Sequence, residues 1–112
     1  MEITERRSGD VVILEFSGRL AIGDGDSQAR ERIAALLAAG ERKVLIDMAG
    51  VTVLDSSGVG ELVAAYNAAT SAHAKIGFVR LSPRVGELLK ITQLIGVLEI
   101  FDSLEDGLSS FS

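Results

Sequence analysis

Hydrophobic and polar positions along the chain follow two different periods, and the change from one to the other separates predicted strands from predicted helices. Residues 2–7 and 11–16 are β-prone runs joined by a Ser-Gly-Asp turn, which predicts an antiparallel hairpin. Further short apolar runs predict three more strands, at residues 44–48, 76–81 and 97–101.

Between these strands, apolar residues recur at spacings of three and four, as they do on one face of an α-helix. The first helical pattern is closed by Gly40, a typical C-terminal capping residue, and the second covers residues 58–72. The predicted apolar faces consist of Ile33, Leu36 and Leu37; of Val59, Leu62, Val63 and Tyr66; of Val85, Leu88 and Leu89; and of Leu104, Leu108 and Phe111.

The starts of the last two helices are marked by capping residues. Ser82 is followed by Pro83, and a hydroxyl cap followed by proline at the first helical position is a strong start signal. Asp102 or Ser103 caps the final short helix. The predicted order is therefore ββαβαβαβα.

This order predicts an α/β fold in one domain over residues 1–112, with a mixed sheet of about five strands and about four helices. Strands separated by helices should pair in parallel, and the opening hairpin should lie at one edge of the sheet. We expect the helices to form a layer over the core.

The amino-acid composition argues against several classes of function. The 112 residues carry a net charge of -5 and no long basic run, so nucleic-acid binding is not expected. With 0 cysteines there is no disulfide framework and no thiolate metal site. No apolar stretch approaches the roughly 18 residues of a membrane span. We expect a cytoplasmic protein with no cofactor and no bound metal.

The most informative segment is the hydroxyl-rich turn between the run at 44–48 and the second helix. Asp55, Ser56 and Ser57 fall at the predicted helix N-terminus, where backbone N–H groups lack intrahelical partners and the helix dipole is positive. A hydroxyl group here is a good cap, and an added phosphate could be accommodated. The turn is suited to carry a switchable charge.

The segment IDMAGVTVLDSSGVGELVAAY, with EFSGRL upstream and LSPRVGELLKITQLIGVLEIFDS downstream, resembles the STAS domain family, and within it the stand-alone bacterial anti-sigma factor antagonists. The resemblance runs from about Ile3 to Phe111. It implies a non-enzymatic binding protein that is phosphorylated on a serine by a partner acting both as kinase and as anti-sigma factor. A metal-dependent serine phosphatase removes the phosphate in this family. Only the unphosphorylated form captures the anti-sigma factor and frees the sigma factor.

Carried over residue by residue, the phosphoacceptor of the family falls on Ser57, with Ser56 as the alternative. Asp55, Ser56 and Gly58 are its immediate neighbours, and Gly58 gives the backbone room. These four residues are the predicted centre of the site.

Acidic residues around the turn are the predicted contacts with the partner. Many family members carry an aspartate directly after the strand that ends in Ser-Gly-Arg-Leu, where this chain has Ala21, and Asp24 and Asp26 are the residues that would take its place. A partner acting on Ser57 must also cover the exposed side of the helix, where we expect Glu61. Basic groups on the partner would complement these carboxylates.

Other interpretations remain open at this stage. The local pattern alone favours an ordinary N-cap at Ser56 or Ser57, and only the full-length resemblance favours a phosphorylation site. The same fold could serve as a scaffold subunit of a large signalling assembly, whereas an antagonist should be a monomer or a weak dimer. A nucleotide-binding protein is the third class, but Gly-Val-Gly at 58–60 is too short for a phosphate-binding loop.

Overall fold

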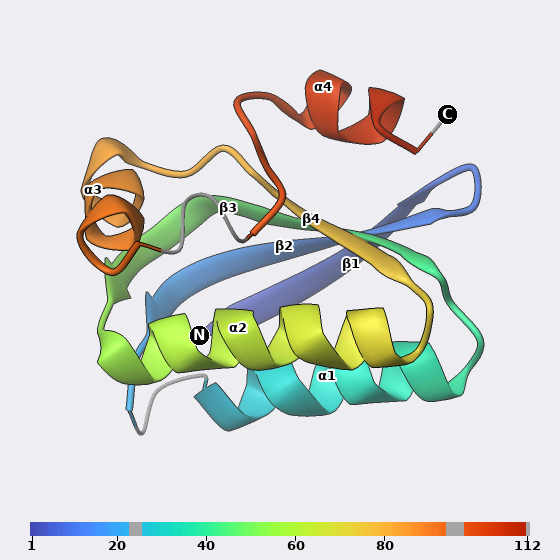
Figure 1. Cartoon of the computed structure of the whole chain (residues 1–112), viewed down its shortest axis with the longest axis horizontal. Helices are drawn as coiled ribbons and strands as arrows, with labels where there is room; N and C mark the ends of the chain where they lie inside the picture. Colours follow the sequence, from blue (N-terminus) through green and yellow to red (C-terminus); the bar gives the residue numbers. More distant parts are fainter. Residues whose placement is uncertain (23–25, 94–97, 112) are drawn as a thin grey trace.

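A five-stranded sheet runs through the middle of the molecule, with helices on both of its faces (Figure 1). The structure is a computed structural model, which describes residues 1–22, 26–93 and 98–111, with residues 26 and 27 described by their backbone alone. The elements are β1 (Glu2–Ser8), β2 (Val11–Leu20), α1 (Asp26–Ala38), β3 (Lys43–Leu54), α2 (Ser56–Ser71), β4 (Lys75–Val79), α3 (Pro83–Ile91), β5 (Ile100–Phe101) and α4 (Leu104–Ser109).

The strands lie side by side in their order along the chain, β1-β2-β3-β4-β5. β1 pairs with β2 in antiparallel orientation and forms one edge, whereas all the other neighbours are parallel. The predicted element order, the mixed sheet and the hairpin at its edge are confirmed.

Two predicted strands differ from the structure at their ends. β4 ends at Val79 instead of Leu81, because Arg80 has a φ of 57°, which takes the chain out of the extended conformation. β5 comprises only Ile100–Phe101, and the predicted start at Val97 lies outside the described residues.

β3 is much longer than the predicted strand at residues 44–48, because it continues through residues 49–54 while it stays paired with β2. The pairing with β2 shifts register twice, so that β3 contains an extra residue at each shift, and such bulges bend and twist a strand. At the first shift the Asp47 carboxylate accepts a hydrogen bond from the Ala49 amide at 3.0 Å. Asp47 is only 2% exposed, and the Arg80 guanidinium donates to both of its oxygens, with Nε 3.1 Å from Oδ1.

The ends of the helices follow the capping signals in the sequence. Gly40 has a φ of 91°, and the Glu41 amide reaches back to the Leu36 carbonyl at 3.0 Å, which closes α1 as predicted. Ser82 caps α3 through the Val85 amide, with Pro83 in the first turn. Of the two candidates for the last helix, Ser103 is the cap, since its hydroxyl accepts from the Asp106 amide at 3.0 Å.

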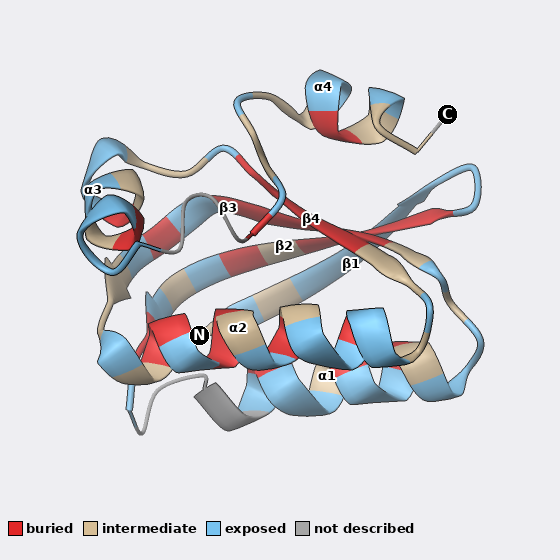
Figure 2. Ribbon diagram, viewed as in Figure 1, coloured by how far each residue is buried: buried red, intermediate tan, exposed pale blue. Residues whose placement is uncertain are grey.

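The helices do not form a single layer, which is where the expected architecture is wrong. Figure 2 shows buried residues on the sides of α1 and α2 that face the sheet, and again on the side of α4 that faces the opposite surface of the sheet. Because residues alternate between the two faces of a strand, Val44 and Ile46 contribute to the core under α1 and α2, whereas Leu45 packs under α4.

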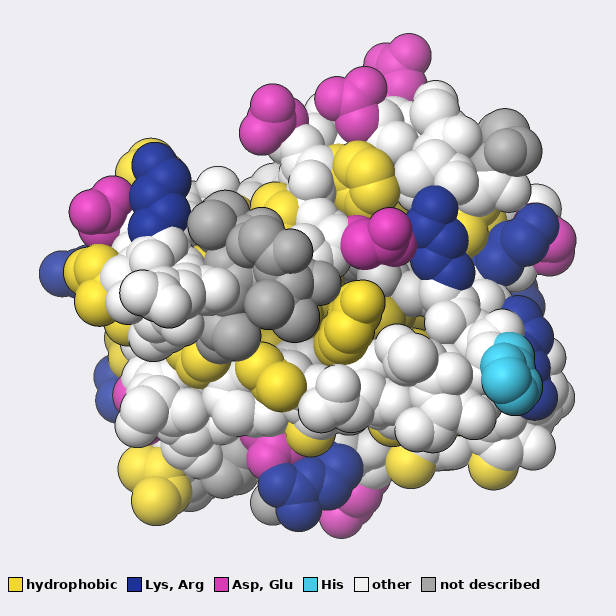
Figure 3. Space-filling view, viewed as in Figure 1, with side chains coloured by type: hydrophobic (Ala, Val, Ile, Leu, Met, Phe, Trp, Pro, Cys, Tyr) yellow, Lys and Arg dark blue, Asp and Glu magenta, His cyan; other side chains and the backbone are white. Residues whose placement is uncertain are grey.

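Charged side chains are scattered in small groups over the face seen in Figure 3. Acidic groups crowd around α4, whose first turn carries Glu105 and Asp106. His73 is exposed just beyond the end of α2. Across the residues described, none of the helices combines the length and the apolarity needed to cross a bilayer.

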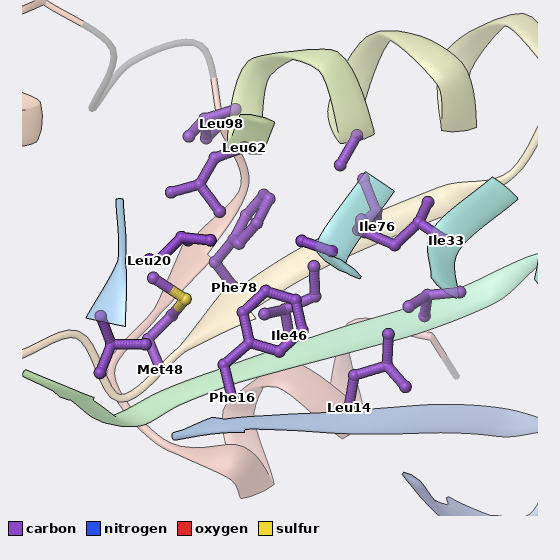
Figure 4. Packing of buried hydrophobic residues seen from close by; sticks show 14 of the residues in the cluster. Leu14, Phe16, Leu20, Ile33, Ile46, Met48, Leu62, Ile76, Phe78 and Leu98 are labelled. Atoms are coloured by element: carbon purple, nitrogen blue, oxygen red, sulfur yellow. The ribbon is translucent and has the colours of Figure 1, made fainter. Parts of the chain in front are cut away.

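The main core lies between the sheet and the pair α1 and α2. Figure 4 shows the side chains of the central strands pointing toward these two helices. The labelled members are Leu14, Phe16, Leu20, Ile33, Ile46, Met48, Leu62, Ile76, Phe78 and Leu98. This packing fixes α2 against the end of β2, and with it the turn at residues 55–58.

Candidate functional site

The turn between β3 and α2 is shaped by the carboxylate of Asp55. Asp55 is the N-cap of α2, with extended backbone angles (φ -110°, ψ -174°), and its Oδ1 accepts the Gly58 amide at 2.9 Å. Its carbonyl oxygen accepts the first intrahelical bond, from the Val59 amide at 2.9 Å. The helix therefore begins at Ser56, directly after a strand, and its first turn lies at the end of the sheet.

The second oxygen of Asp55 reaches a different part of the chain. Oδ2 accepts the backbone amide of Ile22 at 3.1 Å, so that one carboxylate ties the segment after β2 to the start of α2. The hydrogen bonds from the Gly58 and Ile22 amides stabilise the ionised form and lower the pKa of Asp55 below its ordinary value. The turn thus holds a fixed negative charge at neutral pH.

The two serines of the turn differ in exposure. Ser56 is exposed, whereas Ser57 is half-buried, and both belong to the first turn of α2. Their hydroxyls stand where backbone N–H groups and the positive end of the helix dipole would meet an added phosphate. Asp55 is close enough to repel it, since the Ser57 amide also contributes to the lowered pKa of that carboxylate.

Gly58 is required by close packing between α2 and the end of β2. It is buried, and a Cβ placed on it would overlap the carbonyl oxygen of Leu20 and lie 2.7 Å from Cδ1 of Leu54. Any larger residue would push the first turn of α2 away from the sheet. The room that we expected glycine to provide is therefore used by the backbone of β2.

Glu61 is not on the exposed side of α2, contrary to expectation. It is 7% exposed, and the Arg30 guanidinium of α1 donates to both of its oxygens, with Nε 3.0 Å from Oε2. The apolar spacing of α2 did not identify this residue as inward-facing because its partner comes from a distant part of the sequence. The pair links α1 to α2 and leaves this carboxylate little surface for a partner.

The acidic loop before α1 is only partly visible. Asp24 lies outside the described residues, and so does the side chain of Asp26, although the backbone of Asp26 begins α1. Ala21 is 3% exposed, so this position points into the molecule. The contribution of Asp24 and Asp26 to a docking surface stays a prediction.

A groove opens beside the turn. It has a volume of about 700 Å³ and lies between the end of β3 and α3. Its lining consists of Thr52, Val53, Leu54, Pro83, Arg84, Val85, Glu87, Leu88 and Ile91. The sequence pattern did not indicate this groove, because its two walls come from segments that are separated by α2 and β4.

Among the described residues, no group of three or more His, Cys, Asp and Glu side chains is arranged to hold a metal ion. The turn instead combines hydroxyl groups, backbone amides and one fixed carboxylate. This arrangement can accept a modification and change the charge presented to a partner.

Comparisons with known proteins agree with the fold. A family model described as the STAS domain matches residues 2–107, which is nearly the whole chain. No curated protein matches the sequence.

Solved structures with the same fold cover almost the entire chain. An anti-sigma factor antagonist from Mycobacterium paratuberculosis has a TM-score of 0.85 at 21% identity, over 97% of this chain and 92% of its own. An anti-sigma-factor antagonist (STAS) domain protein from Planctomyces limnophilus has a TM-score of 0.82 at 24% identity, over 98% and 97%. The Bacillus cell fate determinant SpoIIAA in its phosphorylated form has a TM-score of 0.75 at 17% identity, over 99% and 100%. At these identities the likeness establishes the fold.

Proposed function

The chain belongs to the STAS domain family, and from this premise we propose that it is an anti-sigma factor antagonist that is switched off by phosphorylation of Ser57. In its unphosphorylated form it binds an anti-sigma factor that is also a serine kinase, and so releases a sigma factor. The observation that carries the proposal is the first turn of α2, where Ser57 lies between the capping carboxylate of Asp55 and the tightly packed Gly58. Structures of the same fold described as anti-sigma factor antagonists support it.

The proposed switch acts through charge. Phosphorylation adds about 1.5 to 2 negative charges, and the helix N-terminus stabilises such a group by roughly 1 kcal/mol or less at an exposed site. The fold should therefore tolerate the modification. Asp55 is already ionised beside it, so a partner that must desolvate the turn meets two like charges. A loss of only about 1.4 kcal/mol lowers an association constant tenfold.

The remaining parts of the proposal follow from this role. The chain itself performs no catalysis and works in the cytoplasm, and a metal-dependent serine phosphatase restores the active form. Asp55, Ser56 and Gly58 lie in the contact surface with the kinase. Asp24 and Asp26 would extend this surface, whereas the buried Glu61 is better explained as a link between α1 and α2.

The first test is to map the modified residue. The chain is incubated with its cognate kinase and ATP, and the phosphorylated peptide is identified by mass spectrometry. We expect phosphate on Ser57, with none incorporated by Ser57→Ala and normal incorporation by the neighbouring control Ser56→Ala. Phosphate on Ser56 alone, or outside the turn, would contradict the assignment.

The second test separates charge from structure. Ser57→Ala should keep its affinity for the partner, whereas Ser57→Asp, which places a permanent charge beside Asp55, should weaken binding about tenfold. Calorimetry gives the two affinities, and thermal melts followed by circular dichroism show that both variants are folded. Equal affinities in two folded variants would contradict the electrostatic switch and leave Ser57 as an ordinary residue of the first helical turn.

A further inference from the structure

Ile22 and Ile91 are the exposed large hydrophobic side chains among the described residues. Ile22 is 76% exposed and Ile91 is 72% exposed. Single exposed apolar residues are common on protein surfaces and need no explanation by themselves. Here, however, the amide of Ile22 is bonded to Asp55 in the serine-bearing turn, and Ile91 lines the same groove as Leu54, the residue before Asp55.

Ile22 is held in place by its backbone. Its amide donates to Oδ2 of Asp55 at 3.1 Å, and the preceding Ala21 is buried. The segment is thus fixed on one side by the N-cap of α2 and on the other by the core, while the side chain of Ile22 projects outward. An apolar side chain on a fixed backbone loses little entropy when it is bound, which is typical of an anchor residue in an interface.

Ile91 belongs to the groove between β3 and α3. Leu54 lines this groove immediately before Asp55 in the chain, and its Cδ1 lies close to Gly58 in the first turn of α2. The groove therefore adjoins the serine turn directly. In Figure 1 the start of α2 lies between α3, which forms one wall of the groove, and the chain that leaves β2. From that chain the Ile22 amide is bonded to Asp55.

The size of a stable interface determines what can cover both features. Such an interface buries about 800 Å² on each partner, which corresponds to a patch roughly 30 Å across. The molecule itself measures 31 × 26 × 24 Å, so a protein whose active site reaches Ser57 covers this entire end of it. Figure 3 shows hydrophobic side chains at the surface on the side of the molecule where α3 and the start of α2 lie.

We propose that Ile22 and the groove lined by Leu54, Val85, Leu88 and Ile91 form the apolar part of the surface that docks the kinase acting on Ser57; this rests on the function proposed above. The occupant is a protein that places an apolar segment, such as one face of an amphipathic helix, in the groove and receives Ile22 in a pocket of its own. Arg84 and Glu87 line the same groove and give that segment a polar border. The apolar contacts provide affinity, and the charge at the turn decides whether binding takes place.

The test uses the kinase that phosphorylates the wild-type chain, with affinity measured by calorimetry without ATP and with KM and kcat measured for phosphorylation. Ile22→Ala and Ile91→Ala should each weaken binding about tenfold and raise KM while kcat is kept. Ile22→Leu, which keeps the apolar surface, should bind nearly as well as the wild type. Glu105→Ala, an exposed change on α4, is the remote control and should have no effect.

The outcomes separate this proposal from the one on which it rests. If the kinase leaves Ser57 unmodified in the wild type, the proposed function is wrong, and the docking surface fails with it. If Ser57 is phosphorylated but both alanine variants bind within twofold of the wild type, only the docking surface is wrong. Sedimentation of the free chain tests whether a second copy of the chain occupies the groove instead. If the wild type forms a dimer and Ile91→Asp does not, the groove is a dimer interface and the proposed kinase site is wrong. Circular-dichroism melts confirm that each exposed substitution leaves the fold intact.

Discussion

Asp55 shows how a single side chain can define both the structure and the charge of the turn. It donates no hydrogen bond in its ionised form and accepts one at each oxygen, from Gly58 in α2 and from Ile22 after β2. Protonation would weaken both contacts at once. Because these hydrogen bonds favour the ionised carboxylate, they lower the pKa of Asp55 in the folded protein.

Asp55→Asn should therefore change how stability depends on pH. A carboxyl whose pKa is lower in the folded than in the unfolded state stabilises the fold above the unfolded value, about 3.9, and this contribution is lost as pH falls through the folded pKa. We expect the variant to be less stable than the wild type at pH 7, and the difference to shrink toward pH 3. Urea unfolding at both pH values measures it. Asp102→Asn, at an exposed aspartate, is the control, and a difference between wild type and Asp55→Asn that is independent of pH would contradict this linkage.

At the scale of elements, the contact between α2 and the end of β2 is too close for any side chain. The missing Cβ of Gly58 leaves the space that the Leu20 carbonyl occupies, with Leu54 packed beside it. Gly60, further along the same helix, is exposed, and beyond its chain neighbours and the surrounding helix backbone no atom lies within 4 Å of where its Cβ would be. The two glycines thus offer a matched comparison within one helix.

Gly58→Ala should lower the free energy of unfolding by about 1–3 kcal/mol or more, because backbone must move to admit the methyl group. Gly60→Ala should instead be neutral or stabilise the protein by up to about 1 kcal/mol, since alanine is the better helix former. Urea unfolding of both variants gives the comparison. Similar stabilities would show that α2 can shift freely relative to β2.

The sequence could predict the features that depend on neighbouring residues. The hairpin and the caps at Gly40 and Ser82 arise from local backbone preferences, and Asp55 was placed at the helix start for the same reason. Ser56 and Ser57 could be predicted as site residues because the turn is contiguous in sequence, and their phosphorylation stays a prediction. The acidic loop at Asp24 and Asp26 was identified by composition alone and is not tested by the structure.

The features that escaped prediction depend on contacts between distant segments. β3 continues past Met48 because its pairing with β2, with a bulge at each register shift, extends to Leu54. Asp47 within the apolar run Val-Leu-Ile-Asp-Met was a signal of a buried ion pair, but its partner Arg80 could not be chosen from the pattern. The Arg30–Glu61 pair was missed for the same reason.

At the scale of the whole molecule, the sheet carries two separate apolar clusters, one on each face. The smaller cluster consists of Val11, Ile13, Leu45 and Val79. It is covered by Leu104 and Leu108 of α4 and by Phe111, which follows that helix. Gly107 allows the close approach, because a Cβ there would lie 2.6 Å from Cγ1 of Val79. The short helix therefore seals a surface that the larger helices cannot reach.

Leu108→Asp should detach α4 and destabilise the protein by about 2–3 kcal/mol, because it puts a charge against the smaller cluster. The exposed sheet surface should then bind a hydrophobic dye. Ser109→Asp adds the same charge at the neighbouring exposed position and should do neither. Thermal melts and dye fluorescence compare the two variants, and equal behaviour would mean that α4 contributes little to this face.

The position of α4 in the chain also affects how the protein is made. All five strands precede α4 in the chain. During synthesis they therefore leave the ribosome exit tunnel before the residues of α4 that cover the smaller cluster. A nascent chain at that stage can pair its strands yet presents an uncovered apolar surface, which favours aggregation. If translation is slow or stops just before Leu104, this apolar surface therefore stays uncovered, and the chain becomes a substrate for chaperones.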